Sequence, residues 1–160
     1  MAVPVADMRS PRRARVLVVE EDPRHGEALS RVLDAAGFQV AVVRSAALAL
    51  RCMRDEQVAV VVLSNSVRGI AVTTAMVARL RTRPEPQLRD AGVVAIVDDQ
   101  VDAAFGLGED ADVVLVRPVD AERLVDAVTE VASTDADARS ARRTSADGSF
   151  FRYRMRLATG

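Results

Sequence analysis

The chain contains no lysine and no tryptophan, and only one cysteine, one histidine and one tyrosine in 160 residues. All 22 basic residues are therefore arginines, which excludes a catalytic or Schiff-base lysine and the lysine of a phosphate-binding P-loop. The lone Cys52 can form neither an internal disulfide nor a cysteine-based zinc site. A secreted, disulfide-stabilised fold is excluded, and we expect a cytoplasmic protein.

Long apolar runs are also missing. The longest unbroken run, residues 58–63, is far shorter than the ~20 residues that a membrane-spanning helix needs. The apolar residues that follow the N-terminal arginines end at Glu20, too early for a signal peptide. Hydrophobic residues make up 49% and charged residues 28% of the chain, as in globular proteins. We therefore expect one globular domain without membrane contact.

The charge distribution divides the chain into three parts. Arginine outnumbers aspartate in residues 1–14, which we interpret as a flexible basic N-terminus. Residues 15–132 are acidic and contain all the recurring apolar segments, so they form the expected domain. Residues 133–160 are basic again, and their small and polar residues up to Gly148 are typical of a linker.

Five short, valine-rich runs predict strands that are buried on both faces, because they do not alternate with polar residues. They cover residues 16–19, 40–43, 58–63, 93–97 and 113–116. Helices are expected between and after these strands. The first begins after Asp22, the second after Ser45, and the third covers 73–83. A short fourth helix covers 102–106, and the fifth begins after Asp120. This alternation predicts an α/β fold, a doubly wound five-stranded parallel sheet of flavodoxin-like strand order 2-1-3-4-5.

Polar residues follow the strands at the edge where ligands bind in such sheets, outside the carboxyl ends of the strands. The sequence places there the acids Glu20 and Glu21, the hydroxyl of Ser64, the carboxylate of Asp98 and the cation of Arg117. Adjacent acids suit a divalent cation such as magnesium. The alternative interpretation is that polar residues simply begin where strands end.

Residues 15–132 resemble the receiver domain of bacterial response regulators. Three segments carry the resemblance, in family order and at family spacing: VLVVEEDP, VVVLSNSVRG and VLVRPVDAERL. The resemblance implies a (βα)5 receiver fold and a role in two-component or phosphorelay signalling. It places Glu20 and Glu21 at the metal-binding acids and Ser64 at the phosphoacceptor position.

The family pattern is altered at the residues on which phosphorylation depends. The family's phosphoacceptor is an aspartate, whereas Ser64 cannot form an acyl phosphate. Its switch hydroxyl and switch aromatic correspond to Val97 and Val114, and its lysine corresponds to Arg117. We expect Arg117 to pair with Glu20, Glu21 or Asp98. No metal is expected, with Glu20 and Glu21 as the ligands of Mg²⁺ if it binds.

These departures predict a non-enzymatic pseudo-receiver that acts by protein–protein interaction. Two alternatives stay open: a small-ligand sensor that uses the altered pocket, and a conventionally phosphorylated receiver that uses a neighbouring acid. The resemblance implies a partner-binding or homodimer face made by the helix at 102–106, the strand at 113–116 and the helix after Asp120.

The C-terminal tail offers a second candidate docking element. Apolar and basic residues alternate after Gly148, which in an extended chain gives one apolar and one cationic face. The alternating residues are Phe151, Arg152, Tyr153, Arg154, Met155 and Arg156. Such a segment can add a strand to a partner's sheet. Three arginines are too few for tight nucleic-acid binding, so nucleic acid ranks behind a protein partner.

Overall fold

The computed structural model describes residues 14–64, 70–98 and 110–144. Its five strands are β1 (Arg15–Val19), β2 (Gln39–Val43), β3 (Val60–Ser64), β4 (Gly92–Val97) and β5 (Val113–Val116). Its helices are α2 (Pro23–Ala35), α3 (Ala46–Asp55), α4 (Ile70–Arg81), α5 (Pro86–Arg89), α7 (Ala121–Ser133) and α8 (Ala136–Arg143). The helix expected over 102–106 and the alternating tail lie outside the described residues.

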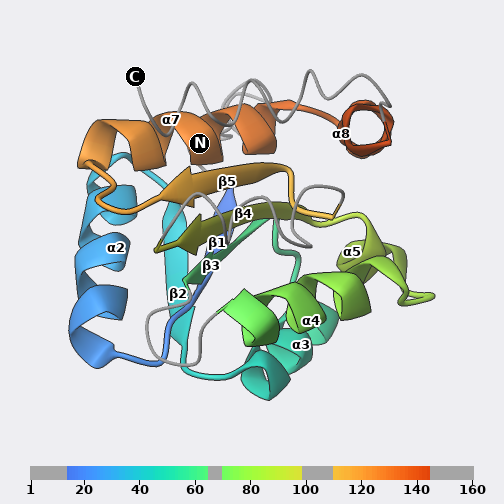
Figure 1. The fold of residues 1–160 in the computed structure, drawn as a ribbon, viewed down its shortest axis with the longest axis horizontal. Coiled ribbons are helices and arrows are strands. Elements are labelled where there is room, and N and C mark those ends of the chain that lie inside the picture. Colours follow the sequence, from blue (N-terminus) through green and yellow to red (C-terminus); the bar gives the residue numbers. More distant parts are fainter. Residues whose placement is uncertain (1–13, 65–69, 99–109, 145–160) are drawn as a thin grey trace, which may run out of the picture.

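The strands form one parallel sheet in the order β2-β1-β3-β4-β5, which confirms the predicted fold. Helices cover both faces of this sheet: α2 and α7 lie on one face, and α3, α4 and α5 on the other (Figure 1). All strands therefore end at the same edge of the sheet, where the predicted site residues should meet.

Both faces of the central strands are buried, because successive side chains point to opposite sides of a sheet. In β1, Val16 and Val18 pack toward α2 and α7, whereas Leu17 packs toward α3 and α4. The same alternation continues through β3 and β4, whose residues from Val60 to Leu63 and from Val93 to Val97 are at most 2% exposed. This two-sided burial explains the valine-rich runs of the strands β1, β3, β4 and β5. The prediction is wrong for the edge strand β2, which is only partly covered and has Val42 41% exposed.

Three predicted helix starts are confirmed, whereas the helix expected over 73–83 is α4, Ile70–Arg81, and the short α5 was not predicted. The side chains of Asp22, Ser45 and Asp120 each accept a hydrogen bond from a backbone N–H in the first turn of α2, α3 and α7. Gly37 follows α2 with a φ of 99°, a conformation that glycine adopts without steric cost. Local sequence thus determines where these helices begin and where α2 gives way to β2.

The C-terminal segment differs from the prediction. Residues 136–143, which their composition assigned to a linker, form helix α8, with the Asp135 side chain accepting the backbone N–H of Ala138. Two arginines of α8 contact the aspartate that precedes β5, far away in the sequence. A composition-based prediction cannot include such a contact, and it missed α8 for that reason.

None of the helices in the described ranges is both long and apolar enough to cross a membrane.

Candidate functional site

The candidate site lies at the edge where the parallel strands end. Glu20 follows β1 and is only 1% exposed, whereas Glu21 is exposed to solvent. Glu20 Oε1 accepts the backbone N–H of Asp22 at 3.0 Å, and the Glu20 backbone N–H donates to the carbonyl of Val43 at 3.0 Å. The Glu20 side chain is thereby directed inward, into the turn that connects β1 to α2.

Asp22 acts as a helix cap. Its carboxylate accepts the backbone N–H of Arg24 at 2.8 Å. This hydrogen bond is the main reason why the pKa of Asp22 is lowered from its usual value. The Asp22 carboxylate is therefore engaged at the start of α2, whose first residue is Pro23.

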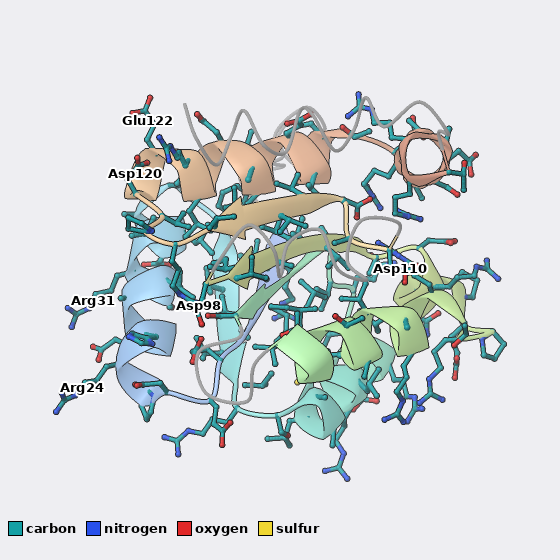
Figure 2. The ribbon with its side chains drawn as sticks, viewed as in Figure 1. Arg24, Arg31, Asp98, Asp110, Asp120 and Glu122 are labelled. Atoms are coloured by element: carbon teal, nitrogen blue, oxygen red, sulfur yellow. The ribbon has the colours of Figure 1, made fainter. Side chains whose placement is uncertain are left out.

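Arg117 connects two of the strand ends. It directly follows β5, and its backbone N–H donates to the carbonyl of Val97 at 2.8 Å. Its Nη1 donates to Oδ1 of Asp98 at 2.8 Å, and its Nη2 donates to Oγ of Ser64. The predicted pairing of Arg117 with one of three acids is thus confirmed for Asp98. Figure 2 shows Asp98 at the edge of the sheet where the strand arrows end.

The environment of the ion pair is partly open to water. The Arg117 side chain is 26% exposed and that of Asp98 is 59% exposed, while Ser64 is half-buried. A guanidinium stays protonated at any physiological pH and has no lone pair to offer, so Arg117 cannot take a proton from the Ser64 hydroxyl. In this arrangement the Ser64 hydroxyl accepts a hydrogen bond from the permanently charged Arg117.

Val97 and Val114 belong to the apolar core. They are 0% and 2% exposed, and both lie in the cluster that packs against α3 and α4. Neither side chain has a polar atom. These positions can therefore respond to a change at Ser64 only through packing.

The donor set does not fit a magnesium ion. Among the described residues, no three side chains of His, Cys, Asp or Glu come together as metal ligands could. Glu20 is oriented by a backbone N–H, and a serine hydroxyl replaces a carboxylate at the end of β3. The cation of Arg117 already lies between Ser64 and Asp98. Proteins hold magnesium through one or two carboxylates and its own waters, and here the end of β3 offers a hydroxyl that is already bound to a guanidinium.

The sequence analysis missed a second cluster of charges at the opposite edge of the sheet. Asp112 precedes β5, is 2% exposed and lies within 4 Å of three arginines, from α4 and α8. These arginines are 27 to 31 residues away in the sequence, so no local motif links them to Asp112. The available signal was an acid directly before an apolar strand, which by itself predicts no partner.

Comparison with known proteins supports the fold. No protein-family model matches the chain. The DNA-binding response regulator MtrA of Mycolicibacterium smegmatis is 31% identical in an alignment 118 residues long, which covers 71% of this chain and 48% of MtrA. The chain thus spans about half the length of this relative.

Solved structures of receiver domains superpose on most of the chain. The chemotaxis response regulator CheY4 of Vibrio cholerae has a TM-score of 0.65 and 19% identity, covering 74% of this chain and 98% of that chain. A CheY-like receiver domain from Methylobacillus flagellatus has a TM-score of 0.65 and 24% identity over the same shares. TrrA of Thermotoga maritima, in complex with Mg²⁺–BeF, has a TM-score of 0.64 and 19% identity, again over these shares. The described part of this chain therefore has the fold of CheY-like response regulator receiver domains.

Proposed function

We propose that this protein is a pseudo-receiver of a two-component signalling system, which takes up no phosphoryl group and acts through protein–protein contacts. One observation carries the proposal: the guanidinium of Arg117 hydrogen-bonds both Ser64 and Asp98 at the strand ends. The acceptor position is thus held by an internal cation and has a hydroxyl in place of a carboxylate.

The chemistry of this site supports a domain that stays in one state. A phosphoryl group on Ser64 would form a stable ester, whereas receivers form an acyl phosphate on aspartate. Val97 has no hydroxyl to receive a phosphoryl oxygen, and Val114 is fixed in the core. A ligand shifts a conformational equilibrium only by binding one of two states more strongly. Here the aspartate that would accept the phosphoryl group is replaced by Ser64, and both side chains that would respond to it are valines.

Exposure to a small phosphodonor tests the proposal. The full chain is incubated with acetyl phosphate and Mg²⁺ and its intact mass is recorded, beside a receiver that has an aspartate acceptor. We expect no phosphoryl adduct on this chain. An adduct on the wild-type chain that hydroxylamine removes would contradict the proposal, because hydroxylamine cleaves an acyl phosphate and leaves a serine phosphate ester intact.

Two variants show which feature prevents phosphorylation. Ser64→Asp restores the carboxylate, and Ser64→Asp combined with Arg117→Lys also replaces the forked cation with a compact one. We expect the double variant to take up more phosphoryl group than Ser64→Asp alone, because Arg117 would otherwise hold the new carboxylate in a bidentate pair.

The partner is a protein that binds either the receiver face around β5 and α7 or the C-terminal tail, and a second copy of the chain is one such partner. Replacing Arg152, Arg154 and Arg156 with glutamine in the full chain tests the tail. Loss of a partner that the unchanged chain retrieves assigns binding to the tail, and retention assigns it to the receiver face. A truncation meant to remove the tail alone should end after Thr144, because α8 contacts the domain.

A further inference from the structure

A buried charge cluster connects α8 to the rest of the domain. The Asp112 carboxylate accepts the backbone N–H of Val93 at 2.8 Å, Arg81 Nη2 at 3.1 Å and Arg143 Nη1 at 2.6 Å, and Arg139 Nε lies 3.8 Å away. The three arginine side chains are only 9–11% exposed. One buried carboxylate therefore faces three guanidinium groups, and Asp90 and Asp135 attract them more weakly from nearby.

Arg81 belongs to the domain independently of α8. Besides Asp112, its guanidinium donates to the backbone carbonyls of Asp110 at 2.9 Å, Arg89 at 2.9 Å and Ala91 at 2.6 Å. These carbonyls lie at the end of α5 and before β4 and β5. Arg81 thus joins α4 to the loops at this edge, and none of these bonds involves α8.

Helix α8 is held almost entirely by polar contacts. It has no buried residue, and its sequence ADARSARR offers only alanine as an apolar side chain. Arg139 donates to the carbonyls of Val131, Thr134 and Asp90, and Arg143 donates to Asp112. An isolated helix of this length is not stable in water, so α8 stays folded only while these contacts hold it against the domain. Figure 1 shows α8 beyond the end of α7, at the edge opposite the strand ends.

Burial and mutual repulsion disfavour the charged forms of the arginines in this cluster. The pKa of Arg81 and of Arg139 is lowered from the usual value chiefly because of burial; attraction by Asp112 offsets part of this, and repulsion by Arg143 adds to it. If α8 separates, Asp112 keeps Arg81 and the N–H of Val93, which forms a one-to-one ion pair. Separation therefore leaves no buried carboxylate without a partner and relieves the repulsion between cations.

We propose that α8 is a detachable latch, a helix that docks on the Asp112 cluster and separates from it as a unit while the five-stranded domain stays folded. Docking fixes the path of the chain beyond α7, and separation frees a basic segment containing Arg139, Arg142 and Arg143. Because Arg139 and Arg143 are attracted to Asp112 by charge, salt and competing anions stabilise the separated guanidinium groups and favour separation. Local opening of this kind is typical of elements with few buried apolar contacts.

Hydrogen–deuterium exchange of the full chain, followed by mass spectrometry, tests the latch. In the wild type we expect the α8 amides to exchange at least tenfold faster than those of α7, and raising the salt concentration should accelerate α8 alone. Arg143→Gln removes one charge-assisted hydrogen bond and should accelerate α8 exchange about tenfold, with α7 and β5 unchanged.

Arg142→Gln is the matched control, because it removes the same charge from the same helix. The Arg142 side chain is 49% exposed and pairs with Glu130 at 3.3 Å, so its loss should change α8 exchange about twofold at most. The proposal is overturned if α8 exchanges in step with the sheet in the wild type, if Arg143→Gln accelerates all elements equally, or if both variants have the same effect. If a variant folds poorly, the salt series on the wild type tests the proposal without it: acceleration of α8 alone supports the latch, and equal acceleration of all elements overturns it.

Discussion

The interaction between Arg117 and Asp98 makes the sharpest prediction about the candidate site. Arg117→Ala removes an ion pair at 2.8 Å and a hydrogen bond to the half-buried hydroxyl of Ser64. Asp98 is 59% exposed, so the ion pair contributes about 0.5 kcal/mol. The hydrogen bond from a cation contributes about 1.5 kcal/mol, which brings the expected loss of unfolding free energy to about 2 kcal/mol.

A double-mutant cycle isolates the ion pair from other effects. The variants are Arg117→Ala, Asp98→Ala and both together, and we expect a coupling of about 0.5 kcal/mol that decreases at high salt. Urea unfolding followed by far-UV circular dichroism is the assay, because the chain has no tryptophan and its single tyrosine, Tyr153, lies in the tail. For a domain of this size, the loss in Arg117→Ala corresponds to a Tm lower by about 8 °C.

The matched control is Arg31→Ala on α2. Arg31 pairs with Glu27 at 2.6 Å, but its side chain is 77% exposed and points outward in Figure 2, so the expected loss is about 0.3 kcal/mol. If Arg117→Ala has an unchanged Tm, or if the cycle gives no coupling between Arg117 and Asp98, the role of Arg117 as the internal cation of this site is refuted.

Two further predictions concern the fold. Gly92→Ala should lower the unfolding free energy by about 1–3 kcal/mol in urea titrations, because its Cβ would lie 2.4 Å from Val131 Cγ1 and 3.0 Å from the Ala59 carbonyl; unchanged stability would contradict this packing. The pKa of Asp22 is lowered, so its hydrogen bond from Arg24 stabilises the fold above pH ~4. This stabilisation is lost as the pH falls through the folded-state pKa of Asp22. The urea midpoint of the wild type should therefore fall more steeply in acid than that of Asp22→Asn.

Arginine provides the cations at both edges of this sheet. At the strand ends, Arg117 joins β5 to Ser64 and Asp98, and at the other edge Arg81 joins α4 to Asp112. A forked, permanently charged guanidinium can bind two acceptors at once and does not release its proton. In a chain without lysine, such contacts do not change between protonation states, which fits the proposal of a receiver that stays in one state.

The fold could be predicted from sequence because its determinants are local or repetitive. Valine-rich runs specify strands that are covered on both faces, and Asp22, Ser45 and Asp120 mark helix starts through bonds to their own first turns. The rule that ligands bind at the carboxyl ends of parallel strands then identified Ser64, Asp98 and Arg117 as neighbours. Residue order alone sufficed for these conclusions.

Only the tertiary structure decided which charges pair. The sequence left Glu20, Glu21 and Asp98 as equal candidates for Arg117, and side-chain placement at the strand ends selected Asp98 while the Glu20 side chain turned inward. Helix α8 is the clearest case, because a polar eight-residue segment has no apolar pattern to mark it as part of a domain. It is held by Asp112, 31 residues before Arg143, and the energy of that contact exists only once β5 and α7 have brought the two together.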